Sequence, residues 1–275
     1  MEEAKTVETE TEDQEEKKQW EDMRGKLNQE YLYDSDWGFV IDILDNRIKK
    51  KFLEPLDLLI KDGKNKGSGF SIVAIECLLI EFFAAFRKGA IFNYNYDENC
   101  PSFQYKDSQS LYVEFLTTVS PFNSQFASIT AQKNGENNMF SATDFYKKVR
   151  CGLLHEGKTK DNWTINLKHR SEQPGIFLRK DKDNDKLKIF RSIFYQKLDS
   201  YFTNYIKEMK EPQSKDLRRN FARKMDNLYT ISRDRKFDWW KDTKPPKSIL
   251  QWLKIFVRNK LKEIYKFLDS KLDKI

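Results

Sequence analysis

An arginine and one of only two histidines lie five residues apart in Phe145-Tyr-Lys-Lys-Val-Arg150-Cys-Gly-Leu-Leu-His155-Glu-Gly157. Histidine titrates near neutral pH and can transfer protons as a general acid or base. Arginine stays charged and can hold a phosphate, or a developing phosphorane, through two parallel hydrogen bonds. These residue types favour chemistry on a phosphodiester, with Arg150 and His155 as the candidate catalytic residues.

The pair falls late in a helix that we expect between Ser141 and Gly157. Ser141-Ala-Thr-Asp144 is a capping box, and Gly157 is a natural stop. Five residues along a helix correspond to a rise of about 7.5 Å, comparable with the distance between neighbouring phosphates of a nucleic-acid strand. They also correspond to a rotation of about 140° around the helix, so one helix does not converge the pair, whereas two facing helices could.

Two carboxylates could support this pair from an otherwise apolar helix that we expect between Phe70 and Arg87. Glu76 and Glu81 are unusual in such a helix. Either could orient Arg150 or His155, although neutralising a buried arginine is the simpler role.

Cys151 and Glu156 are the other possible supporting residues. Cys151 follows Arg150 directly, which could lower the pKa of its thiol, but no base and orienting group for a thiol nucleophile are evident. A purely structural interpretation also stays open, in which Arg150 and His155 cap helix carbonyls and pair with Glu156 or with the two carboxylates of the apolar helix.

We expect neither a metal ion nor a cofactor. His155-Glu156 opens a zincin-like pattern, but Thr159 occupies the position of the second histidine. Asp181–Asp185 resembles the opening of an EF-hand without its turn glycine, which favours a solvated turn. The remaining histidine, His169, is expected to be exposed.

The spacing Arg150-x-x-x-x-His155, late in a helix of a mostly helical chain, resembles the Arg-x(4–6)-His signature of the HEPN superfamily. The segment Val149–Gly157, followed by a strand with a tryptophan, resembles an uncharacterised bacterial branch of that superfamily. The resemblance covers roughly residues 36–210. It implies a HEPN-like helical bundle, and many such proteins are metal-independent endoribonucleases whose active site forms at a homodimer interface.

The resemblance also implies roles for the two residues. Arg150 would stabilise the transition state, and His155 would activate the ribose 2′-hydroxyl or protonate the leaving oxygen, giving a 2′,3′-cyclic phosphate. The family's nuclease motif usually has Asn, Asp or His directly after the arginine, where this chain has Cys151. The resemblance implies a toxin or anti-phage (antiviral) defence role, with RNA as substrate and an antitoxin or defence-complex subunit as a further partner. A HEPN-like module without catalysis, which binds RNA or protein, is the alternative.

The fold class predicted from periodicity is mostly α, with a small β-hairpin insertion and a basic helical C-terminal extension. Pro55 should kink or restart the first helix. The hairpin should pair a strand at 163–167 with one at 175–178. The expected helices span residues 36–62, 70–87, 110–119, 141–157, 186–212, 217–228 and 248–272.

Charge divides the 275-residue chain into three parts. Residues 1–22 carry three basic and ten acidic side chains, and we expect a disordered acidic tail there. Residues 23–212 are nearly neutral and form the predicted HEPN-like domain. Residues 213–275 carry 18 basic and 8 acidic side chains and form the predicted basic helical extension.

The basic extension mixes cations with aromatic rings, a composition that suits single-stranded RNA. An amphipathic helical cap, with its rings in the core and its lysines in solvent, is the alternative. The candidate RNA-binding residues are Arg218, Arg219, Arg223, Lys224, Arg235, Lys236, Trp239 and Trp240.

Composition indicates a cytoplasmic protein. The chain is 39% hydrophobic, enough for a core, and its odd number of scattered cysteines suits a reducing compartment. We expect no secretory leader and no membrane contact, because the longest apolar run, 70–86, is short for a membrane span and contains two glutamates.

Overall fold

The computed structural model describes residues 2–27, 34–62, 67–97, 100–126, 140–167, 175–181 and 183–231. These residues are mostly helical, with two small sheets, as the sequence predicts. The chain divides into two compact units, Met1–Tyr96 with Phe103–Lys241, and Asp97–Ser102 with Asp242–Ile275. Every helix and strand described below belongs to the first unit.

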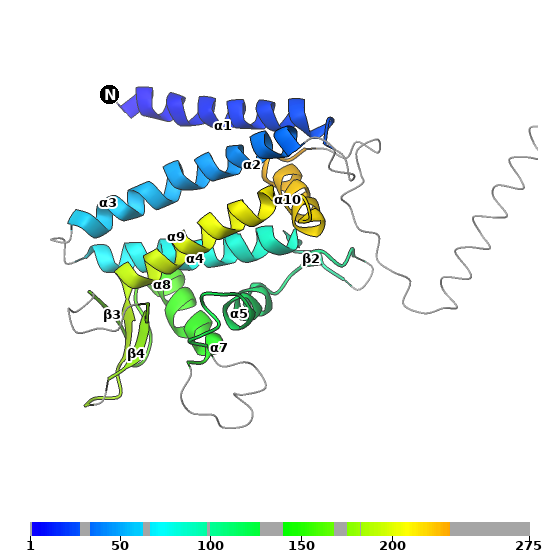
Figure 1. The fold of residues 1–275 in the computed structure, drawn as a ribbon. Coiled ribbons are helices and arrows are strands. Elements are labelled where there is room, and N and C mark those ends of the chain that lie inside the picture. The colour runs from blue at the N-terminus through cyan, green and yellow to red at the C-terminus, as the bar shows by residue number, and fades with distance from the viewer. Residues whose placement is uncertain are drawn as a thin grey trace, which may run out of the picture. The chain divides into compact units, whose positions relative to one another are not determined.

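The helical elements follow one another along the first unit (Figure 1). They are α1 (Glu2–Arg24), α2 (Asp34–Ile48), a π-helical segment η1 (Lys49–Leu53), α3 (Glu54–Asp62), α4 (Ser68–Lys88), α5 (Ser108–Thr118), α7 (Ala142–Asp144), a second π-helical segment η2 (Phe145–Arg150), α8 (Cys151–Glu156), α9 (Arg191–Lys210) and α10 (Lys215–Leu228). The strands are β1 (Ile91–Phe92), β2 (Gln104–Tyr105), β3 (Trp163–Asn166), β4 (Leu178–Lys180) and β5 (Leu187–Phe190).

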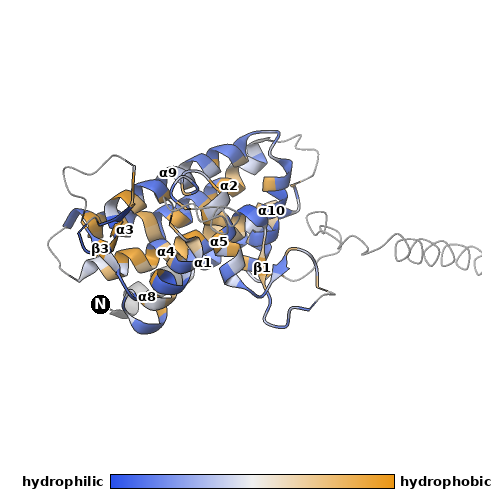
Figure 2. Ribbon diagram, turned by 90° about the horizontal axis from the view of Figure 1, so that it is seen from below, coloured by the Kyte–Doolittle hydropathy of each residue, from blue (hydrophilic) through white to orange (hydrophobic). Residues whose placement is uncertain are grey.

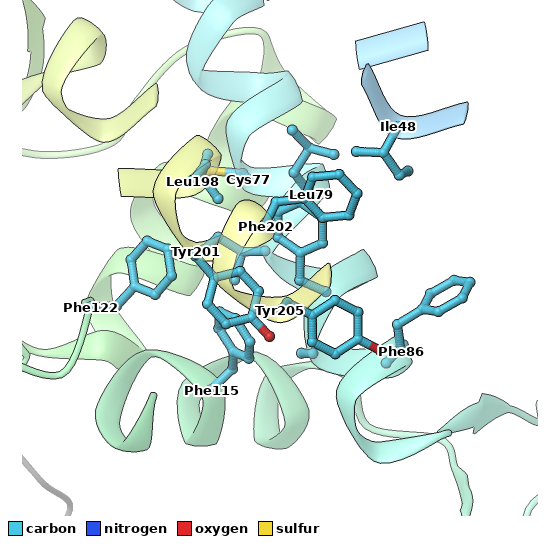
Figure 3. Packing of buried hydrophobic residues seen from close by; sticks show 14 of the residues in the cluster. Ile48, Cys77, Leu79, Phe86, Phe115, Phe122, Leu198, Tyr201, Phe202 and Tyr205 are labelled. Atoms are coloured by element: carbon cyan, nitrogen blue, oxygen red, sulfur yellow. The ribbon is translucent and has the colours of Figure 1, made fainter. Parts of the chain in front are cut away.

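Helix α4 is the centre of the unit, because it contacts α3, α5, α8, α9 and α10. It is apolar almost all round, and apolar residues gather on the inward faces of its neighbours (Figure 2). Figure 3 shows Cys77, Leu79 and Phe86 from α4 packed among rings that include Tyr201 and Tyr205 from α9. Length and composition alone would allow α4 to span a membrane, but 61% of its most apolar window is buried inside the protein. The helix ends at Lys88, one residue beyond the predicted range, and Gly89 caps it with a φ of 59°.

The predicted helix 141–157 exists as one continuous rod. The Ser141 hydroxyl accepts a hydrogen bond from the backbone N–H of Asp144 at 3.1 Å, and Gly157 closes the rod with a φ of 66°. The middle of the rod, η2, is π-helical, a feature that the sequence analysis did not predict. Such π-turns occur frequently at functional sites.

The first predicted helix does not restart at Pro55. Helix α2 passes into η1 and η1 into α3 without a break, and the junction residues Ile48 and Glu54 are both in the right-handed helical region. The change at this point is the π-helical segment directly before the proline, which has no N–H to donate.

The predicted hairpin is wrong in its pairing. Strands β3 and β4 do not pair with each other; both pair with β5, β3 in parallel and β4 antiparallel. The sequence analysis assigned Leu187 and Phe190 to the following helix because their spacing suits one. Leu187 and Ile189 also alternate with polar Lys188, and in the structure α9 begins only at Arg191.

The predicted disorder of residues 1–22 is corrected by the structure, which forms α1 there. Trp20 is fully buried and donates its indole N–H to Asp226 of α10 at 3.0 Å. Arg24 donates twice to the same carboxylate, at 2.9 and 2.8 Å. The composition of the segment is that of a solvated tail, but a few residues at its end anchor it to a partner some 200 positions away in the chain.

The basic extension that we predict from residue 213 does not begin as a separate part. Its first helix, α10, packs against α4 within the first unit. The predicted helix 248–272 lies outside the described residues.

Candidate functional site

Arg150 is the last residue of η2 and points toward α4. Its Nη2 lies 2.6 Å from Oε2 of Glu81, and the two side chains are 16% and 22% exposed. This pairing confirms the expectation that a glutamate of the apolar helix neutralises the arginine. The rest of the guanidinium is largely enclosed, and its buried Nε has no hydrogen-bond partner among the described residues.

The charge on Arg150 is maintained by its surroundings. Burial alone would lower the pKa of the guanidinium, but the carboxylate of Glu81 outweighs it and raises that pKa. Arg150 also lies over the ring of Tyr146, with its guanidinium carbon 5.2 Å from the ring centroid. A cation over an aromatic face is stabilised by the ring quadrupole.

Tyrosines line the same site. Burial raises the pKa of Tyr146 to about 12, against the opposing charge of Arg150. Burial, followed by the negative charge of Glu81, raises the pKa of Tyr105 to about 12 as well. Both phenols therefore stay neutral at physiological pH and can donate a hydrogen bond to a phosphate oxygen.

His155 lies on the last turn of α8 and is exposed. No hydrogen bond or ion pair is recorded for its imidazole within the described residues. Arg150 faces α4 while His155 faces solvent, so one copy of the rod does not bring them together. This agrees with the divergence that the five-residue spacing predicts.

Two of the predicted supporting residues have other partners. Glu156 pairs with Lys160 at 2.6 Å, and this hydrogen bond lowers its pKa. Glu76 is fully buried on the side of α4 that faces α9, where its nearest opposite charge is Arg191. The positive charge of His155 also acts on Glu156, after that of Lys160. A supporting role for Glu76 and Glu156 stays a prediction.

Cys151 remains beside the site. Its sulfur lies 3.9 Å from Nη1 of Arg150, and the residue is partly buried. The thiol is therefore a neighbour of the guanidinium, although successive side chains on a helix generally point apart.

Two of the predicted RNA-binding residues are structural instead. Arg218 is fully buried, donates to the carbonyls of Met209 and Lys210 at 2.8 and 2.9 Å, and lies over the ring of Trp37. Arg223 is 2% exposed and lies over the ring of Phe103 at 4.4 Å. An RNA strand has no access to either guanidinium, because a predicted surface helix is packed into the core.

Two other basic candidates remain reachable from solvent. Arg219 is half-buried and pairs with Asp216 at 3.6 Å. Lys224 is partly buried, and this burial lowers its pKa to about 8 against the opposing charge of Glu81. Lys224 therefore belongs to the electrostatic surroundings of the Arg150–Glu81 pair. His169, Arg235, Lys236, Trp239 and Trp240 lie outside the described residues.

The sequence analysis missed Tyr105 and Tyr146 as residues of the site. Tyr146 lies four residues before Arg150, so helical spacing could have identified it. Tyr105 belongs to the Tyr/Asn-rich connection after α4, and only the fold brings it near Arg150.

Within the described part of the chain, no group of three or more His, Cys, Asp or Glu side chains could hold a metal ion. Comparison with protein-family models, curated proteins and solved structures finds no match for this chain.

Proposed function

We propose that this protein is a metal-independent endoribonuclease of HEPN type. The observation that carries the proposal is the state of Arg150, a permanently charged guanidinium that Glu81 holds in place and whose buried Nε has no hydrogen-bond partner among the described residues. A charge fixed in position before the substrate arrives stabilises a transition state without the cost of reorganisation. The exposed His155 on the same rod supplies the group that can transfer protons.

In the proposed reaction, the imidazole of His155 takes the proton of a ribose 2′-hydroxyl. The 2′-oxygen attacks the adjacent phosphorus, and the bond from phosphorus to the 5′-oxygen of the next nucleotide breaks. Arg150 stabilises the negative charge on the phosphorane. The leaving 5′-oxygen takes a proton from the imidazolium of His155, which restores the neutral imidazole, and the products are a 2′,3′-cyclic phosphate and a 5′-hydroxyl.

A homodimer is part of the proposal, since Arg150 and His155 diverge on one rod. Helices α4 and α8 contact each other, and both carry exposed apolar side chains: Leu78 is 43% exposed and Leu154 is 45% exposed. Pairing of two copies through these helices would bury the apolar groups and bring a second motif to the first. The proposed context is toxin activity or anti-phage defence in the cytoplasm, with an antitoxin or defence-complex subunit as a further partner.

The test is cleavage of an end-labelled RNA by the purified protein in the presence of EDTA. Arg150→Ala should lower the cleavage rate by about 10²–10³-fold, the typical cost of removing one group that stabilises transition-state charge. His155→Ala should lower it by about 10²–10⁴-fold, the typical contribution of general acid–base catalysis. Lys147→Ala is the matched control, because it removes an exposed cation from the same rod. Full activity in either of the first two variants, or no cleavage by the parent protein, would contradict the proposal.

The second candidate function is a HEPN-like module that binds RNA or protein without catalysis. The observation in its favour is the pair Arg150–Glu81 itself, because a half-buried ion pair of this kind also serves to join η2 to α4. Cys151 stands where the nuclease motif usually has a polar side chain. This candidate predicts salt-sensitive RNA binding that His155→Ala does not change, and no cleavage.

A further inference from the structure

We propose that the β1–β2 ribbon is a stacking surface for the unpaired bases of single-stranded RNA, adjacent to Arg150. This inference rests on the proposed function and assigns to it the class of substrate and the place where that substrate binds. The residues that form the surface are Phe92, Tyr94, Tyr105 and Lys106.

The aromatic rings of the ribbon are unusually exposed. Phe92 is 51% exposed and Tyr94 is 75% exposed. Lys106 lies over the Tyr94 ring, with its Nζ 5.6 Å from the centroid. Large rings in contact with water and a cation at their faces form the combination that binds bases and backbone together.

Strand pairing places two of these rings side by side. The parallel register sets Phe92 opposite Tyr105, and their ring centroids are 5.6 Å apart at an interplanar angle of 78°. In this edge-to-face arrangement each ring can cover at most one face of the other. Phe92 keeps about half of its surface in solvent, which leaves room for a nucleobase to stack.

The ribbon is held firmly, although each strand has only two residues. The N–H groups of Ile91 and Asn93 donate to the carbonyls of Phe103 and Tyr105, each at 2.9 Å. The buried guanidinium of Arg223 in α10 packs on the ring of Phe103 at 4.4 Å. A surface that is already ordered loses little conformational entropy when a ligand binds.

The ribbon is continuous with the site. It follows directly after α4 and lies beside α10 (Figure 1). Glu81, which holds Arg150, lies about two turns before the end of α4, and β1 begins three residues after that helix ends. A strand whose bases stack on Phe92 and Tyr94 would therefore place its phosphates toward the Arg150 end of the site, with Lys106 adding positive charge.

Exposed rings select unpaired bases, because the bases of a duplex are already stacked on one another. Base–aromatic stacking contributes about 1–3 kcal/mol per base, and it is tolerant of sequence because every base has a π-face. The occupant is accordingly a single strand, without a preferred sequence at these positions.

The experiment measures binding of a fluorescein-labelled 12-nucleotide 2′-O-methyl oligouridine by anisotropy at fixed salt. The methyl group blocks attack by the 2′-oxygen, so binding is read independently of cleavage. Phe92→Ala and Tyr94→Ala should each weaken binding by about 5–150-fold, the conversion of the stacking energy, and Tyr94→Trp should restore it. Leu58→Ala is the matched control, since this residue is 68% exposed on α3 and has no ring.

Equal binding by the parent and the alanine variants would overturn the inference, and so would equal affinity for the corresponding duplex. A change of sedimentation mass in Tyr94→Ala would also overturn it, because it would identify the ribbon as an interface between copies of the chain. Binding that depends on the ribbon, combined with an absence of RNA cleavage, would support the stacking surface and refute the nuclease. RNA cleavage by the parent protein, combined with equal binding by the parent and the ribbon variants, would support the nuclease and refute the stacking surface.

Discussion

At the residue scale, the two glutamates of α4 show how burial separates the roles of identical side chains. Glu81 is 22% exposed and pairs with Arg150. Glu76, five positions earlier, is fully buried, and only the charge of Arg191 and the backbone N–H of Tyr195 favour its ionised form. Removal of the carboxyl from water outweighs both groups, so its pKa lies well above the ordinary value.

This state of Glu76 has a consequence for stability. Burial raises its folded pKa well above the ordinary value, against the opposing charge of Arg191. Above the unfolded pKa, the unfolded chain has lost this proton while the folded chain still binds it, so stability falls as pH rises toward the folded pKa. The slope is about 1.4 kcal/mol per pH unit for one proton.

Glu76→Gln should remove this slope. The variant should match the parent near pH 4 and exceed it in free energy of unfolding at pH 7, as measured by urea denaturation at several pH values. Glu21→Gln, at an exposed position of α1, is the control and should leave the pH dependence unchanged. Parallel pH profiles for the parent and Glu76→Gln would show that the carboxyl is ionised in the folded protein.

At the element scale, two glycines in the left-handed conformation each end a helix, but their surroundings differ. Gly89 has a φ of 59°, and a Cβ built there would lie 2.7 Å from Cα of Asn220 in α10. Gly157 has a φ of 66°, but a Cβ there would meet nothing within 4 Å. Gly89 thus permits close approach of α4 and α10, whereas Gly157 only turns the chain.

Alanine substitution of these glycines separates the two effects. Gly157→Ala should lower the free energy of unfolding by about 1 kcal/mol, the cost of the left-handed conformation. Gly89→Ala should lower it by a further 1–3 kcal/mol or so, because the backbone of α10 must move to relieve the overlap. Equal losses of free energy of unfolding in the two variants, measured by chemical denaturation, would show that α10 moves away from the added methyl group at no cost.

At the scale of the whole first unit, one carboxylate joins the first and last described helices. Asp226 of α10 is 7% exposed and accepts hydrogen bonds from Trp20 and Arg24 of α1. Other acidic residues of α1 face basic groups elsewhere, since Asp13 and Glu16 pair with Arg47. The acidic segment is therefore part of the folded structure.

Asp226→Ala should leave the charge of Arg24 buried without its partner, at a cost of about 3–5 kcal/mol. The same variant should release α1, which limited proteolysis would detect as early cleavage before residue 27. Asp216→Ala on the same helix is the control, because its side chain is 90% exposed. Protection of α1 in the Asp226 variant would show that α1 is held mainly by its contacts with α2.

Local patterns in the sequence predicted the elements whose signals lie within a few residues. The capping box at Ser141, the stop at Gly157 and the apolar run of α4 were sufficient, because caps and periodicity act over one or two turns. The five-residue spacing of Arg150 and His155 on one helix also predicted that their side chains point in different directions.

The remaining features depend on contacts between distant residues. The disorder predicted for residues 1–22 was wrong because Trp20 and Arg24 are stabilised by Asp226, and the predicted hairpin was wrong because β3 and β4 pair through β5. By itself the sequence determined the mostly helical class, the caps and the spacing of the candidate pair. Only the tertiary structure decided that Glu81 holds Arg150, that Arg223 is buried under the ribbon and that Tyr105 reaches the site, because burial and charge pairing are properties of the packed chain.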